Sequence, residues 1–435
     1  MSSYQLSYGE KKLELDLPSN LVRRVIDAKP LPAIEDEETV VSKALSEPIG
    51  TLRLPELVKP AEKVCIVIGD LTRLWVRHDQ ILRPLLDELN RGGVRDSDIT
   101  IISATGDHRP QSREEHGLLV GEEVLKRVRV IDHNARDREK LKYLGSTSRG
   151  TPVYLNRHAL EADRLILTGG IVYHFLAGWG GGKKALLPGL AGYETIMKNH
   201  SLAFLPPPHE GLNPAVCAGV VEGNPCSDDM LEGAAMGGPD FLVNVIIDDN
   251  RHSIAYAVAG HYNEAFLKGC SLVDQHFSVT IGEPSEAVIA SCGGYPKDVN
   301  FYQTYKTLYN AHFALRKGGT LILVSESREG LGSEDYAGII TGYRTNAERE
   351  KALRLEYTIG AHMGYHTAVL AEEHDILLLT KLPKKIVDAM GMIKINSLEE
   401  GIKFLQKKHG KVPPAYLMPH GGSTLPRACG DYSKL

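Results

Sequence analysis

Short apolar runs alternate with amphipathic stretches through most of the chain. The first runs of strand type are 63–70, 96–103, 128–131, 153–155 and 165–167. Between the first two runs, leucines and isoleucines recur with the spacing of one helix face, at Ile81, Leu82, Leu85, Leu86 and Leu89. Buried strands that alternate with amphipathic helices are typical of a mostly parallel α/β sheet. We therefore predict an α/β fold.

A second series of strands and helices follows a predicted hairpin at 240–262, a stretch rich in β-branched residues and interrupted at 248–250. Strand-type runs then recur at 286–291, 319–325 and 376–379, with the region 347–363 helical between the last two. We predict two α/β domains with mostly parallel sheets, at 1–275 and 276–435. The last strand is expected to pack back on the first domain.

Polar residues follow three of the predicted strands where each one ends. Asp70, Thr72 and Arg73 follow the first strand, His108 follows the second, and His174 follows the run at 165–167. In open α/β sheets the carboxyl ends of parallel strands carry the ligands. One histidine near a strand end is usually structural. Two at the ends of parallel strands indicate proton transfer near neutral pH, because imidazole gains and loses a proton there.

A glycine-rich loop with a lysine pair lies just beyond His174. Its residues are Gly178, Gly180, Gly181, Gly182, Lys183 and Lys184. Glycine permits positive φ and close approach of a ligand to the backbone, and a loop that opens a helix directs N–H groups at an anion. We predict that this loop opens a helix and binds a phosphate-bearing cofactor. A glycine turn packed against the sheet, with both lysines in water, fits the pattern as well.

The phosphate loop of ATP-binding proteins matches this segment poorly. Ala177 stands in place of its first glycine, and Lys184 stands in place of the magnesium-binding Ser or Thr. An ATP-dependent phosphoryl-transfer enzyme that uses the 178–184 loop is nevertheless one alternative function. The chain has no G-x-G-x-x-G fingerprint, so an ordinary Rossmann dinucleotide site is not predicted.

Composition narrows the classes of function. The 435 residues are 42 % hydrophobic and 24 % charged, as in globular proteins. A net charge of −5 gives no electrostatic reason to expect nucleic acid or an acidic membrane as partner. No apolar leader or membrane-length run is present, so we expect a cytoplasmic protein. The six cysteines include no C-x-x-C pair, so neither a disulfide framework nor a zinc site is predicted.

Another polar group lies in the second series. A glycine turn at 293–296 follows a strand, and Asp298 is expected to cap the next helix. Tyr302 and Lys306 are four residues apart and therefore share a helix face, with Gln303 beside them. This set is suited to bind a carboxylate, although an ordinary tyrosine-rich helix with an exposed lysine fits too.

Taken in order, six motifs resemble the nickel-dependent lactate racemase family. They are D-x-T-R (70–73), T-G-x-H-R-P (105–110), H-F-x-A-G-x-x-G-G-x-K (174–184), L-P-G (187–189), I-M-x-N-H (196–200) and G-G-Y-P-x-D-x-N-x-Y-Q-x-x-K (293–306). Each motif alone is short, but their order and spacing together are specific. The resemblance covers most of the chain.

This resemblance implies two α/β domains with the active site in the interdomain cleft. It also implies nickel and a nickel-pincer nucleotide, a pyridinium-3-thioamide-5-thiocarboxylic acid mononucleotide. By similarity, Lys184 is joined to this cofactor through the thioamide, and His200 is the protein ligand of nickel, a metal that imidazole suits. Asp70, Thr72 and Arg73 match the loop that contacts the cofactor. Cofactor-biosynthesis proteins are the implied transient partners.

The activity implied is racemisation or epimerisation of a small-molecule 2-hydroxy acid. By similarity, His108 and His174 are the bases that alternately take and return the hydroxyl proton, while hydride moves reversibly between C2 and the pyridinium ring. The residues expected to bind the substrate carboxylate are Arg73, Gln303 and Lys306, with Tyr302 nearby. A non-catalytic carrier of the nickel pincer is a second alternative, but a carrier needs no paired bases.

The sequence departs from the lactate enzymes directly after Arg73. Those enzymes carry proline at the next position, whereas this chain has Leu74 and then Trp75. We expect Trp75 to wall a larger pocket, and Arg77 to contact a second carboxylate or a polyol. Tyr357 is the predicted counterpart of the aromatic residue that closes the lactate site. A 2-hydroxy acid larger or more polar than lactate is therefore expected.

Overall fold

The protein divides into two compact units in a computed structural model that describes residues 2–32, 36–248 and 251–428. The central unit is Pro30–Gln275, and the terminal unit combines Met1–Lys29 with His276–Lys434. Residues up to Lys29, which the sequence analysis places in the first domain, thus belong with the C-terminal part of the chain. Both units are α/β, as predicted.

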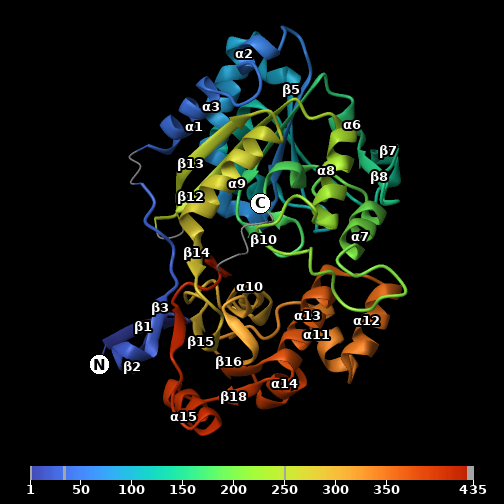
Figure 1. Cartoon of the computed structure of the whole chain (residues 1–435). Coiled ribbons are helices and arrows are strands. Elements are labelled where there is room, and N and C mark those ends of the chain that lie inside the picture. The colour runs from blue at the N-terminus through green and yellow to red at the C-terminus, as the bar shows by residue number, and fades with distance from the viewer. Residues whose placement is uncertain (1, 33–35, 249–250, 429–435) are drawn as a thin grey trace. The chain divides into compact units, whose positions relative to one another are not determined.

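The central unit is built on a six-stranded sheet in the order β13-β12-β9-β4-β5-β6 (Figure 1). Its strands are β4 (Val64–Gly69), β5 (Ile99–Ala104), β6 (Arg129–Asp132), β9 (Arg164–Gly170), β12 (Phe241–Asp248) and β13 (Ser253–Gly260). All neighbours are parallel except β12 and β13, which form the predicted antiparallel hairpin. Residues 249 and 250 of that hairpin lie outside the described residues.

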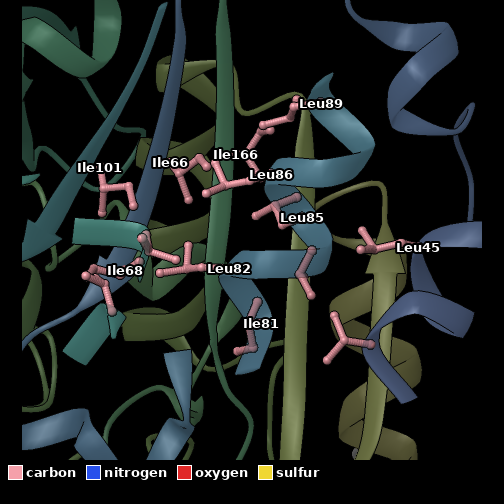
Figure 2. Close-up of a cluster of buried hydrophobic side chains, with 14 of the residues drawn as sticks. Leu45, Ile66, Ile68, Ile81, Leu82, Leu85, Leu86, Leu89, Ile101 and Ile166 are labelled. Carbon is pink, nitrogen blue, oxygen red and sulfur yellow. The ribbon is translucent and has the colours of Figure 1, made fainter. Parts of the chain in front are cut away.

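Helix α3 (His78–Arg91) covers one face of this sheet. Its apolar stripe is fully buried, and Leu82, Leu85 and Leu86 are each 0 % exposed. Figure 2 shows this stripe against isoleucines of β4, β5 and β9, with Leu45 of α1 (Glu37–Ser46) in the same cluster. Burying each leucine contributes about 1.5–3 kcal/mol to the stability of the fold. The predicted helix is therefore confirmed, and it anchors the strands that carry the candidate site.

The terminal unit has its own parallel sheet, in the order β18-β17-β16-β15-β19-β3. Its strands are β3 (Val22–Val25), β15 (Ser285–Ser291), β16 (Leu315–Val324), β17 (Asp375–Leu379), β18 (Ile393–Ile395) and β19 (Ala415–Met418). Strand β20 (Leu425–Ala428) pairs with β14 (Ser278–Ile281). The last two strands therefore pair within the terminal unit, and β19 does so with the N-terminal β3.

The remaining elements lie outside the two six-stranded sheets. A predicted strand at 153–155 lies outside the main sheet, in the antiparallel pair β7 (Leu141–Ser146) and β8 (Pro152–Asn156). The region 347–363, predicted to be helical, forms parts of two helices, α12 (Asn346–Leu355) and α13 (Ile359–Glu373). No helix in the described ranges is long and apolar enough to cross a membrane. The other bounds are β1 (Ser2–Tyr8), β2 (Lys11–Leu17), η1 (Ser19–Leu21), α2 (Leu54–Leu57), η2 (Leu71–Val76), η3 (Asp96–Asp98), α4 (Arg113–Val120), α5 (Glu122–Arg127), η4 (Arg138–Lys140), α6 (Arg157–Leu160), β10 (Tyr173–His174), β11 (Gly178–Trp179), η5 (Gly182–Ala185), α7 (Tyr193–Ser201), α8 (Pro225–Gly237), α9 (Glu264–Phe277), α10 (Phe301–His312), α11 (Glu334–Gly342), α14 (Lys384–Ala389) and α15 (Leu398–His409).

Candidate active site

Three loops leave the carboxyl ends of adjacent strands in the central unit. Strand β4 lies between β5 and β9, and all three are parallel. The loop after β4 is therefore flanked by the loops that follow β5 and β9, at the edge of the sheet where open α/β proteins bind ligands. The predicted residues on these loops are Asp70, Thr72, Arg73, His108, His174 and Lys184.

Asp70 and His108 form a hydrogen-bonded pair. The Asp70 carboxylate is 5 % exposed; its Oδ2 bonds His108 Nδ1, and its Oδ1 accepts from Thr72 Oγ1 at 2.5 Å. Burial favours a raised pKa for Asp70, but the hydrogen bonds from His108 and Thr72 and the charge of Arg73 outweigh it and lower the pKa. Because an ionised carboxylate only accepts, His108 donates from Nδ1 and presents Nε2 as its proton-transfer atom. Asp70 was predicted to contact the cofactor, and its hydrogen bond to His108 was not predicted.

Arg73 is exposed and lies with Thr72 on the short 3-10 helix η2, which begins directly after Asp70. Its Nη1 donates to Thr72 Oγ1 at 2.9 Å, so Asp70, Thr72 and Arg73 form one continuous hydrogen-bonded chain. A guanidinium of this kind presents several donors that suit a carboxylate ligand.

Gln111 joins the loops that carry Asp70 and His108. Its Oε1 accepts from Leu71 N at 2.6 Å, and its Nε2 donates to Ser103 Oγ at 2.7 Å. Asp132 accepts from both the side chain and the backbone of Gln111, at 2.9 and 2.6 Å. Gln111 was not predicted from the sequence, because its only signal is its place three residues after His108.

His78 fixes the end of β4 directly before Asp70. It is 1 % exposed, and its Nε2 accepts from Gly69 N at 2.9 Å. Burial lowers the pKa of His78 to about 4, so the ring is neutral at pH 7. Its Nδ1 is then the donor to Thr168 Oγ1 at 3.3 Å, and that hydroxyl donates to Val67 O at 2.7 Å. This residue was also absent from the sequence predictions.

The glycine loop packs against protein and opens no α-helix. It enters only a four-residue 3-10 turn, η5, so the predicted helix start is wrong. A Cβ at Gly178 would lie 1.9 Å from Val220 O, and a Cβ at Gly182 would lie 2.5 Å from the Phe266 ring. The Gly182 amide donates to Asn244 Oδ1 at 2.8 Å. The glycines are thus required by close packing of the chain on itself.

Both lysines of this loop are removed from bulk water. Lys183 is 1 % exposed and donates to Ser227 Oγ at 2.6 Å. Burial lowers its pKa to about 8. Lys184 is partly buried with its Nζ 2.9 Å from His174 Nε2, and burial together with the charges of Arg73 and Lys183 lowers its pKa to about 7. A lysine with this pKa has a large neutral, nucleophilic fraction at neutral pH.

His174 is held by backbone amides. It lies on β10, which pairs with β11 in a two-stranded turn. Its Nδ1 accepts from Leu176 N at 3.1 Å and from Ala177 N at 3.2 Å, while its Nε2 faces Lys184. The structure therefore brings two of the predicted residues, His174 and Lys184, into direct contact.

His200 is a buried histidine on α7, 2 % exposed. Its Nδ1 donates to Ile196 O at 2.8 Å, so Nε2 is the ring nitrogen that carries the lone pair in the neutral imidazole and could hold a metal. Among the residues that the structure describes, no group of three or more His, Cys, Asp or Glu could hold a metal ion. Cys226 lies near both His200 and Lys184. Its Sγ is 3.7 Å from the carbonyl oxygen of Asn199, the residue before His200, and it is close enough to Lys184 to affect the pKa of that lysine.

Of the predicted carboxylate-binding residues, Arg73 belongs to the central unit, whereas Tyr302, Gln303 and Lys306 lie in the terminal unit, on the first turns of α10. Lys306 Nζ donates to Gln303 Oε1 at 2.9 Å, and Tyr302 is partly buried next to them. The cap of this helix is Asn300, which accepts from Gln303 N at 3.0 Å, and the predicted cap Asp298 is wrong. Asp298 is instead fully buried, where it accepts from two backbone amides.

Arg77 and Trp75, which were predicted to contact the substrate, have different surroundings in the structure. The Arg77 guanidinium lies 3.0 Å from Glu37 Oε1 and donates to His252 O at 2.8 Å, so it stabilises the fold locally. Trp75 is 36 % exposed, and a Cβ at Gly170 would come within 2.7 Å of its ring. The Trp75 ring therefore lies close to Gly170 at the end of β9, next to the loop that carries His174. In the terminal unit, Tyr357 is buried, 7 % exposed.

Comparisons with known proteins agree with the geometry. The family described as Lactate racemase N-terminal domain matches residues 8–212, and Lactate racemase C-terminal domain matches residues 281–425. The lactate racemase of Thermoanaerobacterium thermosaccharolyticum is 35 % identical over 338 residues, 77 % of each chain. That of Lactiplantibacillus plantarum is 30 % identical over 394 residues, 88 % of this chain and 90 % of the relative.

Solved structures extend the likeness to the fold. The lactate racemase apoprotein from T. thermosaccharolyticum matches with a TM-score of 0.89 and 31 % identity, over 98 % of this chain and 100 % of that one. A protein from Thermotoga maritima shares the fold at a TM-score of 0.63 and 19 % identity, over 91 % of this chain and 100 % of that one.

Proposed function

The chain belongs to the lactate racemase family, and from this premise we propose that it interconverts the stereoisomers of a 2-hydroxy acid. Its curated relatives are lactate racemases, so the chain is a racemase, one class of isomerase. The observation that carries the proposal is the Asp70–His108 pair, with His174 on the loop at the other side of β4.

The two histidines are proposed as the alternating acid and base. A racemase must remove the hydroxyl proton from either enantiomer, which requires a base on each face of the substrate. Asp70 orients His108 through Nδ1 and stabilises the imidazolium that forms when Nε2 takes the proton. His174 is proposed as the base on the opposite face, with its Nε2 directed at the site residue Lys184.

Binding of the substrate carboxylate is assigned to Arg73. Its guanidinium is exposed and anchored through Thr72, so its charge is held close to the Asp70–His108 pair. Tyr302, Gln303 and Lys306 of α10 stay predicted carboxylate ligands, and the Gln303–Lys306 contact keeps the amide and the ammonium together on one helix face.

A nickel-pincer nucleotide is the proposed cofactor, and the residues present suit it. Lys184, with a pKa of about 7, is the proposed covalent attachment point, and His200 Nε2 is the proposed nickel ligand. When bound, such a group supplies a reversible acceptor for a hydride from C2 of the substrate. Delivery of the cofactor requires transient contact with the proteins that make it.

The rival functions have weaker support. For an ATP-dependent transferase the glycine loop must cradle phosphates, yet Gly178 and Gly182 are packed against Val220 and Phe266. A non-catalytic carrier has no use for a carboxylate–imidazole pair such as Asp70–His108. As for the substrate, the partly exposed Trp75 ring beside the His174 loop favours a 2-hydroxy acid with a larger substituent than that of lactate.

The test is intact mass and nickel content of protein co-produced with the cofactor-making enzymes. We expect a mass increase and about one nickel per chain. Lys184→Ala should lose the mass increase, whereas His200→Ala should keep it and lose nickel. Lys198→Ala, at an exposed lysine of α7, is the matched control and should retain both. Absence of both adduct and nickel, under conditions that load a known lactate racemase, would refute the proposed cofactor.

A further inference from the structure

Three N–H groups meet at the carboxylate of Asp132, the last residue of β6. Gln111 N donates to Asp132 Oδ2 at 2.6 Å, and Gln111 Nε2 donates to Asp132 Oδ1 at 2.9 Å. The third group comes from α4, where His116 Nε2 lies 2.7 Å from the same Oδ1. The side chains of Asp132 and His116 are 14 % and 11 % exposed, so water competes little for these bonds. Strand β6 is thereby joined to the segment that leads from His108 into α4.

The Gln111 amide has only one orientation that satisfies its neighbours. A backbone amide only donates, so the atom that faces Leu71 N at 2.6 Å must be the oxygen, Oε1. An ionised carboxylate only accepts, so the atom that faces Asp132 must be the NH₂ group, Nε2. Ser103 Oγ lies 2.7 Å from Nε2 and accepts in the same orientation. A reversed amide would set its NH₂ group against Leu71 N–H and its oxygen against the Asp132 carboxylate.

Through this amide, Asp132 acts on the residues proposed to carry the chemistry. Leu71 directly follows Asp70 and begins η2, whose next four residues are exposed. The bond from Leu71 N to Gln111 therefore holds the start of an exposed segment. Asp70 in turn bonds His108 Nδ1, and Gln111 is three residues beyond His108. Both partners of the Asp70–His108 bond are thus held through one side chain whose orientation depends on Asp132.

We infer that Asp132 is a positioning residue, whose carboxylate fixes the orientation of the Gln111 amide and so holds Asp70 in place against His108. Asp132 acts through Gln111 and not on the substrate. Its effect on racemisation rests on the proposed function, whereas the orientation of the amide is a property of the unloaded chain. The two can therefore be measured separately.

The first variant is Asp132→Asn, which keeps the shape of the side chain but offers one oxygen and one NH₂ group to three N–H groups. Either the backbone N–H of Gln111 loses its acceptor, or the Gln111 amide turns and faces Leu71 N–H with a donor. Hydrogen exchange of the Leu71 amide, followed by NMR in the unloaded chain, should accelerate about tenfold or more, the equivalent of one hydrogen bond. In the loaded enzyme kcat should fall about 10–100-fold with nickel content unchanged.

An exchange of the two side-chain groups is the sharper test. Gln111→Glu alone sets two carboxylates against each other and should lose more activity than Asp132→Asn. In the double variant the introduced carboxylate accepts from Leu71 N and from the introduced amide, whose oxygen accepts from the backbone N–H of position 111. His116 then accepts at Nε2 and keeps its proton on Nδ1. The double variant should regain slow Leu71 exchange and a kcat within about tenfold of the wild type, so the two effects are not additive.

Glu114→Gln is the matched control, because it neutralises an exposed acid of α4 whose Oε2 accepts from Ser112 Oγ at 2.7 Å. It should change neither Leu71 exchange nor kcat. The amide of Ile66, in the buried middle of β4, reports whether each variant is folded.

Three results would overturn the inference. They are fast exchange of the Leu71 amide in the wild type, wild-type exchange and kcat in Asp132→Asn, and a double variant no better than the worse single variant. If Asp132→Asn does not fold, the wild-type exchange rate and the double variant still decide. A loaded wild type without racemase activity, with Leu71 exchange that responds as expected, would refute the proposed function and leave the orientation of the amide established.

Discussion

Asp70→Asn tests the carboxylate–imidazole pair in isolation. In the wild type, the buried carboxylate binds His108 Nδ1, and its lowered pKa keeps it ionised at neutral pH. A hydrogen bond to a charged group contributes about 1.5–3 kcal/mol and a neutral one about 0.5–1.5 kcal/mol, so the exchange costs the protonated form of His108 about 1–2 kcal/mol. That corresponds to a loss of about 5–30-fold in kcat. The loss is larger if the introduced amide turns its NH₂ to Nδ1, because the tautomer of His108 then reverses.

The assay is racemisation of a single enantiomer by the loaded enzyme, followed by polarimetry or chiral chromatography. KM should change little, because Arg73, the proposed ligand of the substrate carboxylate, is unaltered. The matched control is Asp107→Asn, one residue before His108, where the carboxylate pairs with Arg136 at 2.9 Å and does not contact the imidazole. Equal rates for the wild type and both variants would refute the assignment of Asp70 as the partner of His108.

Three further predictions follow from the loops around this pair. Gln111→Leu removes the side chain that joins the loops carrying Asp70 and His108. The kcat of the loaded enzyme should fall about 10–100-fold, as is usual when a catalytic group is misplaced. Its nickel content should be unchanged. The pKa of Asp70 is lower in the folded protein than its unfolded value of about 3.9, so the stability that this pair contributes is present above about pH 3.9 and is lost as the pH falls through the folded-state pKa. The difference in melting temperature between wild type and Asp70→Asn should therefore shrink as the pH is lowered through this range. A difference that widens instead would contradict this assignment. Gly182→Ala places a Cβ 2.5 Å from the Phe266 ring at a φ of 58°, so denaturant unfolding should show a loss of about 1–3 kcal/mol, and an unchanged midpoint would argue against that packing.

The strands and the main helix of the central unit could be predicted from sequence because their signal is local. The run at 63–70 became β4, and the stripe that includes Leu85 became the buried face of α3. The polar residues at strand ends were also found locally, since Asp70 and His108 each follow an apolar run. Which of them touch depends on strand order, and that order places β4 between β5 and β9.

Contacts between segments far apart in the chain could not be read from the sequence. The glycine loop looked like a ligand cradle, but Gly178 is required by the carbonyl of Val220 and Gly182 by the ring of Phe266, 42 and 84 residues later. Gln111 has no motif of its own, and its role comes from Leu71 after β4, Ser103 of β5 and Asp132 of β6, which all bond its side chain. The placement of the N-terminal segment also depends on a distant contact, because its strand β3 pairs with β19 near the other end of the chain.

The central claim is that this chain is a 2-hydroxy-acid racemase in which C2 hydrogen leaves and returns as hydride. The most direct test is to incubate loaded enzyme with one enantiomer of lactate, and of larger 2-hydroxy acids, carrying deuterium at C2. The account predicts formation of the opposite enantiomer with the deuterium retained, and loss of this activity in His108→Ala. No interconversion of any such acid, or racemisation in which the deuterium is replaced by solvent hydrogen, would contradict it.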